Sequence, residues 1–483
     1  MQTAPPTHLD LTPLGESVTE PRIDLFSSTP EITGTYEPES MVRAPLDIFH
    51  GYIGVFVVAF LVTLFVTPIM RRLAVNNGIV DRPGESRKVH RVPIAYLGGV
   101  AVFLGLLAAF AFSFFGPDLP TVLYSNHVPD DEQRFIPFSI LLGMTVITII
   151  GLWDDVFGLD PRLKIAGQLL AAAALALDDV GVKVAQGVLA PIGRALGNEA
   201  LTWHVPLPFT LPLLPSGEIT IDAIYWAGTA IIAVFVLGGC NASNLIDGLD
   251  GLLTGVTAIA AAGFTVIALF MAAHNDGGID TARIVLCLAL LGACLGFLPH
   301  NFNPATIFLG DCGSLLLGYM TVATILTLGD TGKTHFVVAG LIIYSIPIMD
   351  TVLAIVRRKL SGKPMSAADD QHLHHMLRRA LGVKGAAFAL YAIGLVFAGL
   401  GVWLTFGRVR VVFTIAMVLF GFIGVTAVKI ARRQAIEKHA IHRSASQRRR
   451  RTPLADPDPT SHEDPAIHEH PPETVASDGP RPA

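Results

Sequence analysis

Acidic and amide side chains recur at intervals of three in one polar stretch that lies between two apolar segments. Asn241, Asn244, Asp247 and Asp250 would share one face of a helix, because positions three and four apart are neighbours on its surface. Gly248, between the two acids, lets a ligand or another backbone approach closely. Oxygen ligands on one face suit Mg²⁺ or a Mg²⁺-bound diphosphate. The spacing differs from that of an EF-hand, so no calcium loop is expected.

Two further polar stretches carry acids at the ends of apolar segments. Asp154 and Asp155 are adjacent, and neighbouring carboxylates repel each other unless a cation or a proton stabilises them. They suit a metal site or a base with a raised pKa, and a solvated acidic helix end is the alternative. Asp311 follows Asn301 and lies between two glycines, where it would be a metal ligand or a helix N-cap. Phe308 would stack on a base or contact lipid or core.

Basic side chains that suit phosphates occur in two other stretches. His372, His374 and His375 lie close together without the spacing of a helical zinc site, and imidazoles donate hydrogen bonds to phosphates or carry positive charge. A chance cluster is the alternative. Lys88 lies in a basic stretch that the excess of Lys and Arg in cytoplasmic loops would also explain. With no nucleophilic serine, catalytic cysteine or phosphate-binding glycine loop visible, this inventory predicts phosphoryl transfer at a diphosphate.

The elements that must position these residues are membrane-spanning helices. Of the 483 residues 52% are hydrophobic and 15% are charged, against about 25% charged in soluble proteins. The charges gather between long apolar runs, which excludes a large soluble enzyme. We therefore expect an all-α membrane protein, a polytopic bundle of about 11 transmembrane helices. The expected spans are Tyr52–Met70, Ile94–Phe115, Phe135–Trp153, Ile165–Leu177, Ala223–Cys240, Leu252–Ala273, Ile284–Leu298, Gly313–Leu328, Phe336–Val356, Gly385–Phe406 and Val411–Val428.

The distribution of Lys and Arg predicts how the bundle is oriented. Basic residues concentrate in the loops after the odd-numbered spans and directly after the last span, so these sides are cytoplasmic and the N-terminus is outside. All the polar stretches above then lie on the cytoplasmic face of the inner (cytoplasmic) membrane. Residues 1–48 and 432–483 are predicted to be disordered tails around a transferase domain of residues 49–431. Residues 182–220 are predicted to form a small extracytoplasmic hairpin or loop.

The polar stretches together resemble the polyprenyl-phosphate N-acetylhexosamine-1-phosphate transferases, glycosyltransferase family 4. The resemblance covers about residues 80–382 and leaves both tails out. The chain departs from the family's usual residues at Ala95, Tyr96 and Asp370. The matching motifs occur in the family's order and read RKVHRVPIAYLGG, GLWDDVFGLDPRLKIAGQ, NASNLIDGLDGLLTG, HNFNPATIFLGDCGS, IPIMDTVLAIVRRKLSGK and DDQHLHHMLRRALG.

The resemblance implies a role for each polar residue. Asn244 and Asp311 would hold Mg²⁺, with Mn²⁺ as an alternative ion. Asp154 and Asp155 would handle the carrier phosphate or the metal, and Asp247 would be an essential acid beside the diphosphate. The other implied roles are uracil binding by Asp250 and Phe308, diphosphate contacts by Lys88, His372, His374 and His375, substrate binding at Gly248, and support of the site by Lys164 and Asn301.

The histidine motif selects a branch of the family. The phospho-N-acetylmuramoyl-pentapeptide transferases carry three consecutive histidines, and here Leu373 interrupts them, as in the branch that uses UDP-N-acetylglucosamine. The resemblance therefore implies transfer of N-acetylglucosamine 1-phosphate from UDP-N-acetylglucosamine to undecaprenyl (polyprenyl) phosphate, with release of UMP. This would be the first membrane step of cell-envelope polysaccharide synthesis. The pentapeptide transferase activity is the alternative.

Two other classes remain to be weighed. A membrane transporter would place ionisable residues in the middle of its spans, and only Asp350 does so here. A non-catalytic membrane anchor would not need the complete set of acids and histidines. The expected partners are the UDP-sugar, the polyprenyl phosphate lipid and the bilayer. No nucleic acid is expected, and a homodimer is compatible with the sequence.

Overall fold

The computed structural model describes residues 44–81, 93–115, 136–206, 218–274, 279–360, 362 and 372–451. Lys88 and most of both predicted tails lie outside these residues. The described elements are α1 (Pro45–Asn76), β1 (Val80–Asp81), β2 (Ile94–Ala95), α2 (Gly98–Phe115), α3 (Phe138–Phe157), α4 (Pro161–Leu177), α5 (Val182–Leu196), β3 (Thr202–Pro206), β4 (Glu218–Asp222), α6 (Ala223–Ile246), α7 (Leu252–Ala273), α8 (Asp280–Asn301), α9 (Gly310–Leu328), α10 (Thr334–Ile343), α11 (Ser345–Leu360), α12 (Leu373–Phe406) and α13 (Val409–Arg451).

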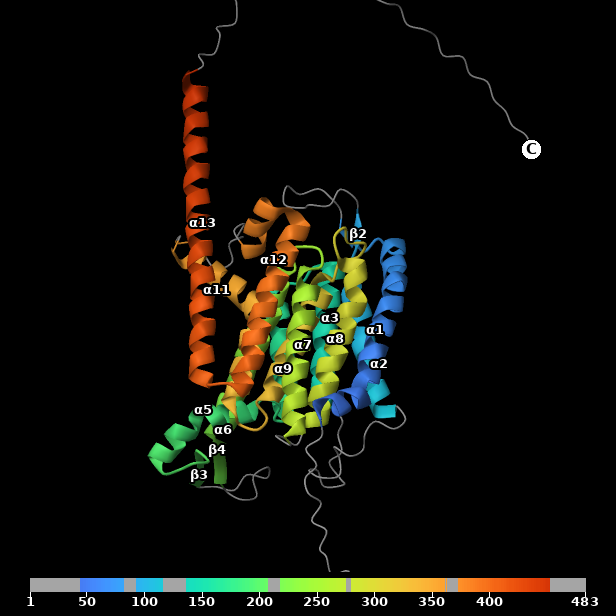
Figure 1. The fold of residues 1–483 in the computed structure, drawn as a ribbon, viewed down its shortest axis with the longest axis vertical. Helices are drawn as coiled ribbons and strands as arrows, with labels where there is room; N and C mark the ends of the chain where they lie inside the picture. Colours follow the sequence, from blue (N-terminus) through green and yellow to red (C-terminus); the bar gives the residue numbers. More distant parts are fainter. Residues whose placement is uncertain are drawn as a thin grey trace, which may run out of the picture. The chain divides into compact units, whose positions relative to one another are not determined.

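The helices confirm the predicted class of a polytopic helical membrane protein. Within the described ranges, nine helices are long and apolar enough to span a bilayer, or up to eleven if each of two bent pairs forms one span. The long helices lie side by side, as Figure 1 shows. The domain boundary predicted at residue 431 lies within α13, which continues as a helix to Arg451.

The span predicted at Phe336–Val356 is not one straight helix. It consists of α10 and α11, which are bent by 77° around Tyr344. The physical reason is Pro347, which has no N–H to donate to the carbonyl of Ile343 and whose ring clashes with that carbonyl. The bend brings Asp350, in α11, against the start of α12.

The second bent pair begins with the span predicted at Ile165–Leu177. That span is α4, and α5 continues after a bend of 73°. The predicted hairpin is present as β3 and β4, which pair antiparallel with Thr202 opposite Asp222. The helix α5 was not predicted, because its proline and glycines resemble loop composition. Pro191 lies inside α5, and glycines occupy both of its caps.

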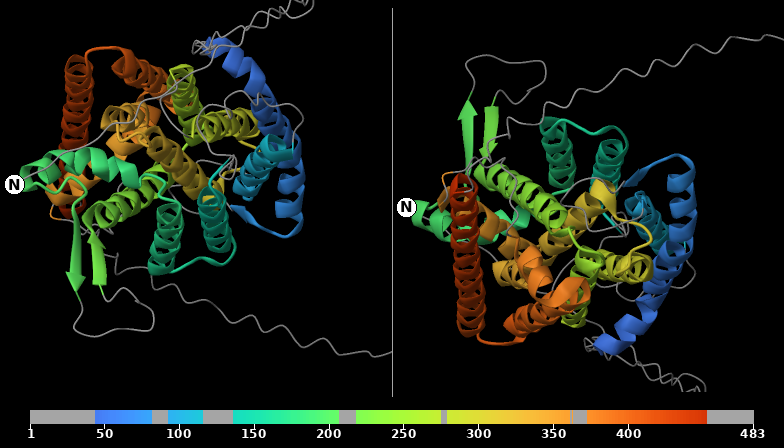
Figure 2. Two further views of the ribbon diagram at one scale, coloured as in Figure 1. Left: turned by 90° about the horizontal axis from the view of Figure 1, so that it is seen from below. Right: turned by 90° about the horizontal axis from the view of Figure 1, so that it is seen from above.

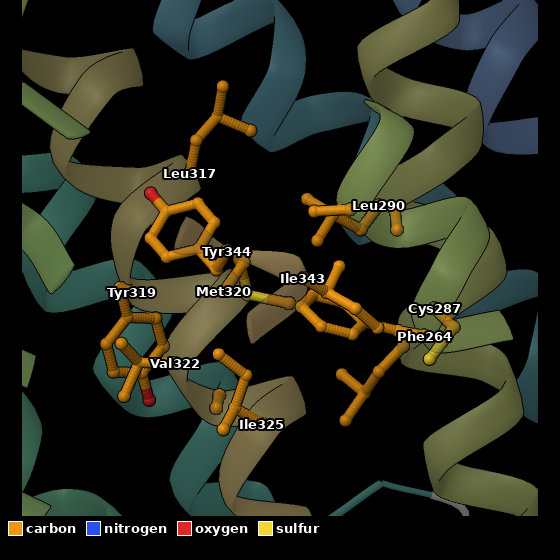
Figure 3. Close-up of a cluster of buried hydrophobic side chains, with 14 of the residues drawn as sticks. Phe264, Cys287, Leu290, Leu317, Tyr319, Met320, Val322, Ile325, Ile343 and Tyr344 are labelled. Carbon is orange, nitrogen blue, oxygen red and sulfur yellow. The ribbon is translucent and has the colours of Figure 1, made fainter. Parts of the chain in front are cut away.

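Helix α9 lies at the centre of the packing. It contacts α2, α3, α6, α7, α8 and α10, and 94% of the residues in its 18-residue apolar stretch are buried. Figure 3 shows the core around it, to which α7 contributes Phe264, α8 contributes Leu290 and α9 contributes Met320. The end views in Figure 2 show the helices packed around one another. This tight packing fixes the first turn of α9, where Asp311 lies.

Glycines allow two helices to approach the start of α9 closely. A Cβ atom on Gly99 in α2 would lie 2.2 Å from the backbone nitrogen of Gly313. A Cβ on Gly151 in α3 would lie 2.5 Å from the Cα of Cys312. Small residues at such contacts allow membrane helices to pack backbone against backbone. The ends of α2 and α3 are therefore held against the turn that carries Asp311.

Candidate active site

The adjacent acids at the end of α3 have different partners. Asp155 accepts the backbone N–H of Asp311 at 2.7 Å and that of Cys312 at 3.0 Å, and so caps α9. A Cβ on Gly310 would lie 2.4 Å from the Asp155 carboxylate, so this turn requires glycine. Asp154 instead accepts the N–H of Leu159 at 2.6 Å.

Lys164, in the first turns of α4, connects two acids. Its ammonium group forms ion pairs with Asp154 and with Asp311. Asp311 also accepts a hydrogen bond of 2.7 Å from the amide of Asn244, which donates to Ser314 as well. The residues that the sequence placed in a metal site, Asn244 and Asp311, are therefore in direct contact, and a lysine lies where the acids converge.

Two further acids follow the end of α6. Asp247 is the C-cap residue of α6, and burial raises the pKa of its carboxyl to about 8. The negative charges of Asp311, Asp155 and Asp250 raise this pKa further. Burial and the neighbouring acids thus both favour the protonated form of Asp247.

Asp250 and Asn301 organise the loop between α8 and α9. Asp250 accepts hydrogen bonds from the amide of Asn303 at 2.8 Å and from the N–H of Ala305 at 3.1 Å. Asn301 is buried, accepts the N–H of Gly251 at 3.1 Å and donates to the carbonyl of Ile307 at 3.1 Å. Asn241, predicted on the same face as Asn244, instead bonds Gln168 at 2.9 Å and links α6 to α4.

The histidines surround Asp350. The Nδ1 atoms of His372 and His374 lie 3.1 and 3.2 Å from the same carboxylate oxygen, and the N–H of Leu373 donates to the other oxygen at 2.7 Å. The Nε2 atom of His374 would lie 2.6 Å from a Cβ on Gly248, so this histidine abuts the loop that carries Asp247.

The Asp350 cluster also places three possible metal ligands close together. The ligand atoms of Asp350, His372 and His374 all lie within 4.8 Å of one another, which holds for no other such group of His, Cys, Asp and Glu in the described ranges. All three residues are buried. Because both imidazoles face one carboxylate oxygen, the arrangement is explained by hydrogen bonds that orient the two rings.

One cavity of about 770 Å³ collects most of the predicted residues. Four predicted residues lie outside its lining: Asp154, Lys164, His372 and His374. Lys164 pairs with Asp154 and with the lining residue Asp311, and the two histidines bond Asp350. His375 lines the cavity and has a buried Nδ1 atom that finds no hydrogen-bond partner among the described residues. The predicted residues in the lining are Asn244, Asp155, Asp247, Gly248, Asp250, Asn301, Phe308, Asp311 and His375.

Other cavity residues were not predicted from the sequence. Arg71 and Arg378 line it, as does Tyr96, whose ring centroid lies 6.2 Å from that of Phe308. The two arginines lie in basic stretches whose charge the membrane orientation already explained. Asp350 does not line the cavity but bonds two of the histidines, and it was not predicted as a site residue. In the sequence it stands out as a single acid in an apolar span.

The fold and cavity define a multi-pass membrane protein with a large polar site, lined by acids and arginines, at one end of its helices. The model of glycosyl transferase family 4 matches residues 137–329. A probable undecaprenyl-phosphate N-acetylglucosaminyl 1-phosphate transferase of Bacillus subtilis is 32% identical over 345 residues, 71% of this chain and 82% of that protein. A decaprenyl-phosphate N-acetylglucosaminephosphotransferase of Mycobacterium leprae is 34% identical over 336 residues, 66% of this chain and 75% of that protein. The chain belongs to glycosyl transferase family 4, which confirms the resemblance of its motifs.

A relative named for another activity also matches. A phospho-N-acetylmuramoyl-pentapeptide-transferase of Desulforudis audaxviator is 30% identical over 358 residues, 71% of this chain and 95% of that protein. Family membership therefore leaves the sugar donor to be decided by experiment.

Proposed function

We propose that this protein transfers N-acetylglucosamine 1-phosphate from UDP-N-acetylglucosamine to a polyprenyl phosphate such as undecaprenyl phosphate, and releases UMP. The names of the Bacillus and Mycobacterium relatives support this assignment. The observation that carries it is the cavity to which Asn244, Asp247, Asp311 and His375 all contribute from distant parts of the sequence. We place this step at the cytoplasmic face of the inner membrane, at the start of cell-envelope polysaccharide synthesis.

The proposed reaction exchanges one phosphorus–oxygen bond for another. An oxygen of the carrier phosphate attacks the β-phosphorus of the UDP-sugar and forms the new bond. The bond from this phosphorus to the oxygen that bridges it to the α-phosphorus breaks, and UMP leaves with that oxygen. The sugar keeps its bond to the β-phosphate, so the lipid product is a polyprenyl diphosphate sugar.

The residues at the acidic side of the cavity fit Mg²⁺. Asn244, Asp247 and Asp311 offer hard oxygen ligands. Burial and, to a lesser extent, the neighbouring acids raise the pKa of Asp247, and a cation beside its carboxyl would favour the ionised form. When bound there, Mg²⁺ would neutralise charge that develops on the diphosphate during transfer. Lys164 holds Asp311 in place and lowers the repulsion between Asp311 and Asp154.

The basic side of the cavity suits the phosphates. Arg71, Arg378 and His375 are among the cavity's lining residues, and guanidinium groups bind phosphate oxygens through paired hydrogen bonds. Positioning and charge neutralisation are the main contributions that a protein makes to phosphoryl transfer. We assign the diphosphate to the space between these residues and the acids.

The nucleoside end of the donor is assigned to the aromatic wall. Phe308 and Tyr96 line the cavity with their rings 6.2 Å apart, so uracil would stack against this wall. One Asp250 oxygen already bonds Asn303 and Ala305, so Asp250 shapes the wall and can contact uracil only with its remaining acceptor capacity.

A panel of UDP-sugars tests the donor assignment. The purified protein in lipid nanodiscs is given polyprenyl phosphate, Mg²⁺ and one UDP-sugar at a time, and released UMP is measured together with the lipid product. We expect turnover with UDP-N-acetylglucosamine. Turnover only with the muramoyl-pentapeptide donor would move the protein to the other branch. Movement of substrate across the bilayer without any product would support a transporter instead.

A further inference from the structure

Helix α5 and the hairpin β3–β4 lie a full helix length from the cavity. The hairpin leads directly into the first residue of α6, Ala223, whereas Asn244 and Asp247 lie at or just after the last turn of α6. With 24 residues, α6 is roughly 36 Å long, because each residue adds about 1.5 Å. The hairpin and the cavity therefore lie at opposite ends of the membrane-spanning helices (Figure 1).

Helix α5 carries an exposed apolar stripe. Val188, Ile192 and Leu196 are spaced by four residues and are 53%, 51% and 64% exposed. This spacing places them on one face of the helix, while Lys183 and Arg194 fall on another. Because α5 is bent by 73° from α4, it runs across the direction of the spans.

The hairpin has one apolar face that is partly exposed. Trp203 pairs with Ile221 and Val205 pairs with Ile219, so the four side chains share a face, and each is at least 40% exposed. His204 lies on the other face. In both end views of Figure 2 the two strands project outward past the neighbouring helices, so the hairpin extends sideways, across the bundle axis.

A lipid surface fits these features better than water does. An isolated two-stranded hairpin is marginally stable in water, and exposed apolar faces of this kind mark interaction sites. An amphipathic helix that lies across the spans and carries bases on its polar face is typical of interfacial helices. Trp226, in the first turn of α6 directly after the hairpin, is 65% exposed, and tryptophan is enriched at membrane interfaces.

We propose that α5 and the β3–β4 hairpin rest on the bilayer surface at the end of the bundle opposite the cavity. The stripe of Val188, Ile192 and Leu196 and the hairpin face of Trp203 enter the boundary between headgroups and acyl chains. Lys183 and Arg194 remain at the headgroups. Together these elements form a lateral support that fixes the depth of α4 and α6 in the membrane.

Tryptophan fluorescence of the full-length protein in nanodiscs tests this placement. Replacing Trp153, Trp226 and Trp403 by phenylalanine leaves Trp203 as the single reporter. We expect brominated lipids to quench Trp203 strongly, most when the bromines lie near the headgroups, and aqueous iodide to quench it weakly. The quenching should not depend on the protein-to-lipid ratio.

A matched variant moves the reporter to the polar face. In the same background, Trp203→Phe combined with His204→Trp shifts the indole by one strand position and thus to the opposite face of the hairpin. We expect iodide to quench this variant strongly and brominated lipids to quench it weakly. If the triple phenylalanine variant does not fold, the quenching of Trp203 can be obtained from the difference in emission between the native chain and Trp203→Phe.

Two results would overturn the proposal. One is a Trp203 that iodide quenches and brominated lipids do not, because the apolar face would then point into water. The other is a Trp203 shielded from both quenchers, together with cross-links between copies through the hairpin, which would make a second copy of the chain the partner.

Discussion

The carboxylate of Asp155 accepts the backbone N–H of Asp311 across 2.7 Å, although the two residues lie 156 positions apart. Asp155 thereby stabilises the first turn of α9, where the dipole of the helix also favours a negative charge. Asp311 is left free to point its side chain at Asn244 and Lys164. One acid of the pair thus positions the acid that we assign to the metal.

Removal of this cap should lower both stability and activity. Asp155→Ala leaves two N–H groups at the start of α9 without an acceptor, and loss of a helix cap costs about 1 kcal/mol. We expect a lower unfolding temperature in detergent and a loss of UMP release. Asp222→Ala, which removes the side-chain cap at the end of α6 far from the cavity, is the control, and it should lose stability but keep UMP release. Wild-type activity in Asp155→Ala would contradict the positioning role.

The raised pKa of Asp247 predicts a pH dependence of stability. The folded pKa of about 8 lies above the unfolded value of about 3.9, so the folded state binds more protons between these pH values. Stability therefore falls as pH rises through this window, by on the order of 1 kcal/mol between about pH 6 and pH 8. Unfolding temperatures of metal-free protein should show this slope, and Asp247→Asn should make it shallower.

Mg²⁺ should oppose the loss of stability that a rise in pH causes. Since a divalent cation favours the ionised carboxylate, we expect Mg²⁺ to raise the unfolding temperature more at about pH 8 than at about pH 6. In Asp247→Asn this difference should shrink. An equal Mg²⁺ effect at both pH values in the wild type would remove Asp247 from the proposed metal environment.

Asp350 should matter for turnover without touching the cavity. It orients His372 and His374, and loss of such an orienting carboxylate typically reduces activity about 10- to 100-fold. We expect Asp350→Asn to lower kcat by this range and to leave KM for the UDP-sugar within a few fold. Asp222→Asn, at the cap of α6 near the hairpin, is the control and should keep kcat. An unchanged kcat in Asp350→Asn would show that the orientation of the histidines is not used.

The contact between Gly248 and His374 can be tested by a double-mutant cycle. Gly248→Ala places a Cβ 2.6 Å from Nε2 of His374, so the ring must move and UMP release should fall. In a His374→Ala background the same change should add little, because the clash is gone. Gly238→Ala, which meets nothing within 4 Å, is the control. Additive losses in the cycle would show that Gly248 acts independently of His374.

The sequence predicted the class of fold and the grouping of polar residues because both follow from periodicity and charge. Apolar windows locate the spans, and basic loops identify their common side. Asn244, Asp247 and Asp311 lie at span ends on that side, and the structure brings them into one cavity.

What the sequence did not predict depends on individual contacts. A pair of acids can be assigned to one face of a membrane, but only the structure separates Asp155, a helix cap, from Asp154, a partner of Lys164. The bend at Tyr344 places Asp350 beside the histidines, and no local pattern measures that approach. Helix α5 was missed because glycine and proline outweighed its apolar periodicity.

Binding of Mn²⁺, measured by electron paramagnetic resonance with UDP-N-acetylglucosamine present, tests the central claim most directly. We expect the wild-type protein in nanodiscs to bind Mn²⁺ at one site and Asp311→Asn to lose both this site and metal-dependent UMP release, at a similar unfolding temperature. Asp330→Asn, which alters the partner of Lys183 away from the cavity, should keep both. Full Mn²⁺ binding and full activity in Asp311→Asn would contradict a metal-bound diphosphate held by Asp311.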